Sequence, residues 1–186
     1  MLVLIKGAGD LATGTAVRLY RAGIPVVMTE VARPTAVRRT VAFSQCMYDG
    51  AAQVEGISAR RAEDAGAARR ALERGEVPVL CDPEAAILMG LPFDGVVDAI
   101  LAKRNLGTRI TDAPVVIGVG PGFTAGVDCH AVVETLRGHS LGRVIPAGSA
   151  LPNPGIPGLT GGFAGDPVLR ATGAGVFHQL LDMGAP

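Results

Sequence analysis

The sequence predicts an α/β protein built on a mainly parallel, doubly wound sheet. Short apolar runs alternate with segments of helical periodicity, and this strand-helix-strand order is typical of parallel sheets. A glycine-rich turn follows the first apolar run directly, as it does in folds that bind dinucleotides. Prolines and glycines concentrate towards the C-terminus. We therefore expect a Rossmann-like domain over residues 1–145 and a glycine/proline-rich segment over residues 146–186.

Composition excludes several classes of function. The 186 residues carry 17 basic and 17 acidic side chains, so no net field attracts nucleic acid or an anionic membrane. No apolar run is long enough to span a membrane, and Met1 leads directly into a strand-like segment without the features of a signal peptide. The 3 cysteines are widely spaced, which favours a reducing compartment over a disulfide framework. We expect a cytoplasmic protein.

The N-terminal part of the chain alternates between apolar and helical segments. Strands are expected at Leu2–Ile5 and Pro25–Thr29, where the apolar runs are short and continuous. Helical spacing over Leu11–Arg21 predicts the helix between them. Further helices are expected over Pro34–Tyr48, with proline in the first turn, and over Ala59–Arg74, which is rich in Ala, Arg and Glu.

The alternation continues in the second half of the chain. Apolar runs at Val77–Cys81, Val96–Ala102 and Pro114–Val119 raise the number of expected buried strands to about five. A helix is expected to begin at Asp82. The segment Asp128–Arg137 suits either a short helix or a strand, and its alternation slightly favours a strand.

The motif Gly7-Ala8-Gly9-Asp10-Leu11-Ala12 has the form G-x-G-x-x-A between a strand and a helix. Gly7 permits a tight turn, Gly9 lets the backbone approach a pyrophosphate, and Ala12 allows close packing of the helix on the sheet. The first turn of the helix, through Thr13, offers N–H groups without internal partners, which bind anions. The alternative is a glycine turn with a purely structural role.

Two acidic residues bear on this motif in opposite ways. Glu30 follows the second strand, where a carboxylate in such folds binds the ribose diol. Asp10 lies inside the loop, where its charge opposes a phosphate unless it caps the helix or holds a metal ion. We predict a cofactor site formed by Gly7, Gly9, Asp10, Leu11, Ala12, Thr13 and Glu30.

A second glycine-rich segment, from Gly118 to Gly126, follows the strand that ends near Val119. Successive N–H groups in such a loop can form an anion-binding nest, which makes Gly120, Gly122 and Thr124 further candidates. The segment lacks the Gly-Lys-Ser/Thr of a P-loop, so kinase or NTPase chemistry is disfavoured. A flexible turn is the equally plausible interpretation.

Other polar side chains form a second group of candidates. Asp82 follows a strand and either contacts a ligand or starts a helix. Lys103 and Asn105 follow the next strand and either clamp a phosphate or lie in a solvated loop. Asp128 and His130, on one face of the expected strand, could transfer protons or bind a metal, although most lone histidines are structural. No definite metal site or catalytic set emerges.

The order of the motifs resembles a known family. The blocks that carry the resemblance are KGAGDLATG, TEVARPTAVRR, CDPEA, VDAILAKRNLGT, GVGPGFTAGVDCHAVVETLRGHSLGR and PNPGIPG. Together they resemble the accessory proteins of selenium-dependent molybdenum hydroxylase systems, which are similar in their Rossmann part to xanthine dehydrogenase accessory factors. The match extends over nearly the whole chain.

The resemblance implies maturation or insertion of the molybdenum cofactor of a hydroxylase. The ligand would be a phosphate-bearing pterin such as molybdopterin cytosine dinucleotide, and the partners would be the hydroxylase or other maturation proteins, with a homo-oligomer also compatible. It further implies a small C-terminal β module, whose start Val176–Gly184 resembles. The alternatives are a small NAD(P)-binding oxidoreductase and a scaffold that only docks a partner. Whether the chain catalyses a reaction stays open.

Overall fold

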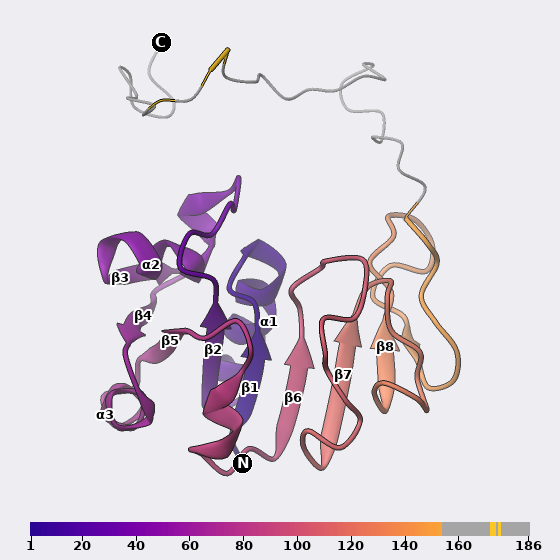
Figure 1. Cartoon of the computed structure of the whole chain (residues 1–186), viewed down its shortest axis with the longest axis horizontal. Coiled ribbons are helices and arrows are strands. Elements are labelled where there is room, and N and C mark those ends of the chain that lie inside the picture. The colour runs from indigo at the N-terminus through magenta and orange to yellow at the C-terminus, as the bar shows by residue number, and fades with distance from the viewer. Residues whose placement is uncertain (154–171, 174, 176–186) are drawn as a thin grey trace. The chain divides into compact units, whose positions relative to one another are not determined.

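The computed structural model describes residues 1–153, 172, 173 and 175 (Figure 1). One compact unit runs from Met1 to Asn153, so residues 146–153 belong to the same unit as the sheet. The rest of the glycine/proline-rich segment, including the expected β module at 176–184, lies outside the described residues apart from these three positions. No described helix is both long and apolar enough to cross a membrane.

The described residues form an α/β unit around one mixed sheet of 9 strands, in the spatial order β3-β4-β5-β2-β1-β6-β7-β8-β9. All neighbouring pairs from β4 to β8 are parallel, and the two edge strands β3 and β9 pair antiparallel. The strands are β1 (Val3–Lys6), β2 (Val26–Glu30), β3 (Ala51–Val54), β4 (Ile57–Ala62), β5 (Val77–Cys81), β6 (Gly95–Asp98), β7 (Val115–Val119), β8 (Ala131–Val133) and β9 (Val144–Ile145).

The strand order reverses direction at β1. The chain moves from β1 to β2 on one side, and later returns to place β6 on the other side of β1. The arrows of these strands point the same way in Figure 1, so their carboxyl ends share one edge. Loops that leave two such strands in opposite directions open a crevice between them, where ligands of parallel α/β sheets bind.

Helices lie on both faces of the sheet. The helices are α1 (Asp10–Arg21), α2 (Cys46–Asp49) and α3 (Ala65–Glu73), with short 3₁₀ turns η1 (Arg39–Val41), η2 (Phe43–Gln45) and η3 (Ala86–Met89). Ile5 and Met28 pack with Ala12 and Ala16 of α1 in one core, whereas the opposite face packs against α3 in a second core. Both faces are buried at the centre of the sheet because the parallel strands β1, β2 and β5 are apolar on both sides.

The prediction of a helix over Ala59–Arg74 is wrong for the residues up to Asp64. Residues 57–62 form β4, which pairs with β5, and α3 begins only after Asp64. The Asp64 side chain accepts a hydrogen bond from the Ala67 amide at 2.7 Å and so caps the helix. Arg and Ala favour a helix locally, but pairing with a buried neighbour decides the conformation of β4.

The continuous helix expected over Pro34–Tyr48 is not present either. Only η1, η2 and the four-residue α2 are helical, and Pro34 lies in an irregular segment. The segment is fastened to the N-terminal loop instead, since the Ser44 amide donates to the Ala8 carbonyl at 2.8 Å and the Phe43 amide to the Thr13 hydroxyl at 2.9 Å. These tertiary bonds replace the hydrogen bonds of a continuous helix.

Other predicted strands are confirmed. The strands expected at Val77–Cys81 and Pro114–Val119 are present as β5 and β7, and the ambiguous segment after Asp128 contains the short strand β8. The run Val96–Ala102 is a strand only to Asp98. The described residues form nine strands, whereas about five were expected. The hairpin of β3 and β4 and the short strands β8 and β9 are not among those five, because their periodicity in the sequence is weak.

Candidate functional site

The Gly7–Ala12 loop joins β1 to α1 at the centre of the sheet. Gly7 has φ +93°, and a Cβ there would lie 3.0 Å from the Ala99 carbonyl oxygen, so the loop lies directly against the segment that follows β6. Gly9 differs, because a Cβ at this position would meet no atom within 4 Å. The absence of a side chain at Gly7 serves the packing of the protein, whereas at Gly9 it leaves open space.

That open space is a cavity of about 320 Å³ at the carboxyl edge of β1, β2 and β6. Six of the sequence-predicted residues line it, namely Gly7, Gly9, Asp10, Leu11, Ala12 and Glu30. Its other walls are residues 34–36 and the segment Ala99–Leu101. A smaller cavity of about 70 Å³ adjoins it and shares Gly7 and Glu30. The structure therefore brings most of the first motif together around one space.

The negative charge of Asp10 is compensated by an ion pair. One carboxylate oxygen accepts a hydrogen bond from the Leu11 amide at 2.9 Å, and the other forms an ion pair with Arg38, which the sequence did not single out. The pair bridges the loop to the irregular segment that was expected to be helical. An Asp in the first turn is favoured by the helix dipole, and Arg38 removes much of its repulsion towards a phosphate.

Glu30 holds the loop in place. Its carboxylate accepts hydrogen bonds from the Ala8 amide at 3.0 Å and from the Val31 amide at 2.8 Å. Each carboxylate oxygen has two acceptor sites, so one on each oxygen stays open to a ligand hydroxyl. Thr13 is different, because its hydroxyl is buried and donates to the Ala8 carbonyl at 3.1 Å. Thr13 supports the loop from behind and does not line the cavity.

A buried charged cluster lies beneath the cavity, and sequence reasoning missed its lysine. The Lys6 ammonium donates to the Thr108 hydroxyl at 2.6 Å and lies 3.7 Å from Asp98 Oδ2. The Thr108 hydroxyl in turn donates to Asp98 Oδ2 at 2.6 Å. The Lys6 and Asp98 side chains are only 5% and 2% exposed. A single lysine at the end of an otherwise apolar strand is the signal that could have revealed it.

This cluster ties down the loop between Asp98 and Thr108. Asn105 closes the same loop, since its side chain accepts from the Gly107 and Thr108 amides and donates to the Thr108 carbonyl. Two non-glycine residues of the loop, Leu101 and Lys103, have φ +61°. Such conformations persist only where the surroundings enforce them. Asn105 is thus a structural residue, while Leu101 forms part of the cavity wall.

The second glycine motif has a packing role. A Cβ at Gly118 would lie 2.5 Å from the Phe123 ring, and one at Gly120 would lie 2.8 Å from the Thr135 hydroxyl. At Gly122 it would lie 2.6 Å from the backbone of Arg104. These positions need glycine because the protein itself approaches closely, so no ligand is required to explain them. None of Gly120, Gly122 and Thr124 lines the cavity at Gly9.

The polar residues around β8 do not converge. Asp128 accepts from the Thr124 amide at 2.8 Å, His130 Nδ1 accepts from the Val116 amide at 3.0 Å, and the Thr124 hydroxyl lies 3.1 Å from that of Ser149. In the part of the chain that the structure describes, no three His, Cys, Asp or Glu side chains are arranged to hold a metal ion. Asp82 likewise caps η3 by accepting from the amides of Ala86 and Ile87.

Cys46 and Cys129 are not activated thiols. Burial raises the pKa of Cys46 to about 12 and also raises the pKa of Cys129, so both stay protonated in the two cores. Cys81 is exposed at the end of β5. A nucleophilic cysteine needs a lowered pKa, and Cys129 has the opposite.

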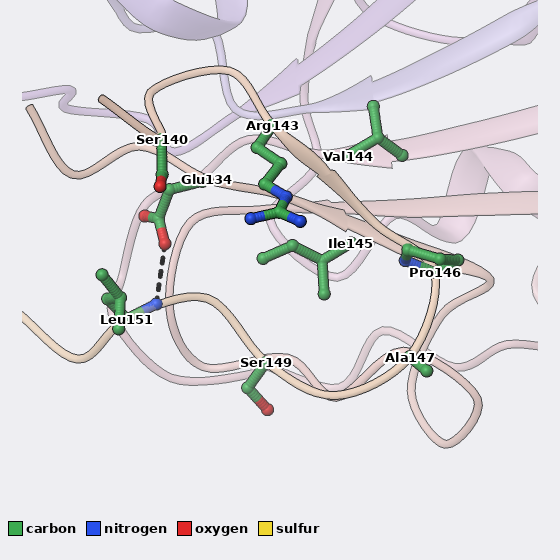
Figure 2. Close-up of a pocket in the computed structure, with 9 residues that line it drawn as sticks. All are labelled: Glu134, Ser140, Arg143, Val144, Ile145, Pro146, Ala147, Ser149 and Leu151. Atoms are coloured by element: carbon green, nitrogen blue, oxygen red, sulfur yellow. Dashed lines mark hydrogen bonds between the residues drawn. The ribbon is translucent and has the colours of Figure 1, made fainter. Parts of the chain in front are cut away.

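Glu134 lies in the wall of a separate cavity of about 370 Å³ beside β9 (Figure 2). Its buried carboxylate accepts hydrogen bonds from the amides of Thr135 at 2.7 Å and of Leu136 and Leu151 at 2.8 Å. The dashed line in Figure 2 marks the bond to Leu151, and the Arg143 side chain extends into the same cavity. The bonds from Leu136, Leu151 and Thr135 outweigh burial and lower the pKa of Glu134.

Glu134→Gln is therefore expected to destabilise the protein in a pH-dependent way. The amide nitrogen of Gln would face the Leu151 amide, and leaving such a donor unsatisfied costs about 1–3 kcal/mol. The folded-state pKa lies below the unfolded value of about 4.3, so the carboxylate stabilises the fold above that pH and this contribution is lost as the pH falls through the folded pKa. Urea unfolding should show a difference between variant and wild type at neutral pH that shrinks in acid. An equal difference at both pH values would contradict this role.

Comparison with known proteins gives one relative of undefined function. Over 183 residues the chain is 52% identical to a protein of Escherichia coli strain K12 described as the uncharacterized protein YqeB. The alignment covers 98% of this chain but 34% of that relative, so the chain spans about a third of the relative's length. No family model matches the chain, and no solved structure matches it.

Proposed function

We propose that this protein binds a phosphate-bearing nucleotide or pterin cofactor at the start of α1 and serves the maturation or insertion of the molybdenum cofactor of a hydroxylase. The observation that carries the binding proposal is the cavity beside Gly9, where a Cβ would enter open space. In this proposal the chain binds the cofactor and transfers it to a partner, and no catalysed reaction is included.

Three further features support a phosphate site. The cavity lies where the strand order reverses, and a Rossmann-like arrangement places its ligand at this point. Asp10 and Ala12, in the first turn of α1, line the cavity, and the amides of a first turn bind anions. The Arg38 guanidinium is paired with Asp10, which lines the cavity, and an arginine in this position could instead bind a phosphate.

The choice of cofactor rests on the motif resemblance. Six sequence blocks resemble accessory proteins of selenium-dependent molybdenum hydroxylase systems, and three of those blocks contribute to the cavity or to the loops around it. Molybdopterin cytosine dinucleotide carries both phosphate and nucleotide, the two groups that the proposed site would bind. The partner would be the hydroxylase or another maturation protein, and the cytoplasm is the expected compartment.

A second candidate function, an NAD(P)-binding oxidoreductase, is favoured by Glu30. Its carboxylate follows β2 and lines the cavity, as expected for a residue that binds a ribose diol. Thermal unfolding in the presence of NAD⁺, NADP⁺, CTP, ATP and molybdopterin species separates the candidates, because a ligand that binds only the folded state raises the melting temperature. A selective shift with a pterin or cytidine nucleotide supports cofactor maturation, whereas one with NAD(P) supports the oxidoreductase.

Gly9→Val is expected to abolish this ligand-induced shift. The valine side chain would extend into the open space beside the loop, and its Cβ would meet no protein atom within 4 Å, so the melting temperature without ligand should change little. Gly14→Val is the matched control, because Gly14 lies further along α1, is exposed, and a Cβ there would also meet no atom within 4 Å. An undiminished shift in Gly9→Val, or an equal loss in Gly14→Val, would contradict a site at Gly9.

A further inference from the structure

A second cavity lies next to the first. Its volume is about 230 Å³, and its walls are mainly apolar, with Leu11, Leu101, Pro121, Leu136 and Leu151 among them. Leu11 and Leu101 also line the cavity beside Gly9, so the two spaces share a wall at the carboxyl edge of the sheet. The two cavities therefore adjoin each other at Leu11 and Leu101.

The wall of the second cavity includes one cation. Lys103 lines it, and within residues 1–153 its ammonium has no ion-pair partner. Leu101 and Lys103 are the two residues of this loop with φ +61°. Non-glycine residues in this conformation cost free energy and cluster at ligand clamps. The strained turn therefore presents an apolar side chain to both cavities and a cation to the second.

We propose that the two cavities receive the two halves of one ligand: a nucleotide diphosphate beside Gly9, and a flat nitrogen heterocycle in the apolar cavity beside Lys103. This inference rests on the proposed function and assigns a separate cavity to each half of its dinucleotide-type cofactor. Lys103 then recognises the carbonyl-bearing edge of the ring and contributes to specificity.

Size and chemistry support this assignment. Cofactor sites commonly have volumes of about 300–1,000 Å³, and the two cavities together fall well inside that range whereas the second alone does not reach it. Apolar walls with few polar groups are typical of sites for ring systems. The walls of the first cavity include the carboxylates of Asp10 and Glu30, which can accept hydrogen bonds from sugar hydroxyls, and the first turn of α1, whose amides suit the phosphates.

The test compares ligands that differ in the ring. The whole chain is titrated calorimetrically with two pairs of probes, ADP against NAD⁺ and CDP against molybdopterin cytosine dinucleotide kept anaerobic. In at least one pair, the ring-bearing probe should bind about tenfold more tightly or better. Lys103→Ala should remove most of that gain and leave the affinity for ADP or CDP unchanged. Leu136→Glu, which places a charge in the apolar wall, gives an independent second variant.

The outcomes separate this inference from the proposed function. Suppose that the two probes of each pair bind with equal affinity, and that Gly9→Val abolishes the binding of ADP or CDP. This result would overturn the assignment of a ring to the apolar cavity but would leave the phosphate site at Gly9 supported. A Lys103→Ala variant that weakens ADP or CDP as much as the longer probes places Lys103 on the phosphate and also overturns the inference. If none of the four probes binds the wild-type chain, both proposals fail.

Discussion

Lys6→Met is expected to lower the free energy of unfolding by about 3–5 kcal/mol, the usual cost of removing one partner of a buried ion pair. The methionine would fill similar volume but leave the Asp98 carboxylate buried without its cation, and Thr108 without its donor. Equilibrium urea unfolding measures the loss. The cause is the burial of the pair, because an exposed ion pair contributes about 1 kcal/mol or less.

Two further variants test that cause. Lys6→Met combined with Asp98→Asn removes both charges, and the Asn can still accept from the Ile100 amide and donate to the Thr108 hydroxyl. This double variant should recover much of the stability. Lys103→Met is the matched control, since Lys103 is exposed and should change the stability little. Equal effects at Lys6 and Lys103 would show that the cluster is not a significant source of stability.

Gly122→Ala is expected to cost roughly 3 kcal/mol or more. The residue has φ +112°, which an L-residue adopts at a cost of about 1–2 kcal/mol. The added methyl group would lie 2.6 Å from the backbone of Arg104, and overpacking of this kind costs about 1–3 kcal/mol. The two effects add because the backbone of Arg104 cannot move aside as a flexible side chain can.

Gly126→Ala separates the two effects. Gly126 lies in the same segment and has φ +88°, but a Cβ there would meet no atom within 4 Å. This variant should therefore lose only the conformational part, about 1 kcal/mol. Chemical unfolding of both proteins gives the comparison. If Gly126→Ala were as destabilising as Gly122→Ala, close packing against Arg104 would not be the reason for the glycine.

The contact at Gly122 also connects the two halves of the candidate site. Arg104 belongs to the loop that the Lys6 cluster ties down, and the neighbouring Leu101 and Lys103 border the two cavities. A loosened loop should thus weaken ligand binding as well as stability. We expect Gly122→Ala to lower the affinity for the longer probes even where the variant remains folded.

The strongest local patterns were predictable from the sequence. The apolar runs of β1, β2, β5 and β7 are short, continuous and flanked by turn residues, and such runs indicate buried parallel strands. The loop from Gly7 to Ala12 and the helix after it were recognisable because spacing of glycines and apolar residues is a local property. Glu30 was placed at the cavity for the same reason, since it ends a strand.

Only the tertiary structure decided which glycines border open space and which charges pair. Gly9 and Gly122 look alike in sequence, yet one borders open space and the other a neighbouring backbone. The pairing of Lys6 with Asp98, and of Arg38 with Asp10, joins residues far apart in the chain. The sequence by itself determined the buried strands β1, β2, β5 and β7, the helix α1 and the position of the candidate phosphate-binding loop. Contacts between distant segments determined the rest, because they depend on the packing of the whole sheet and not on neighbours along the chain.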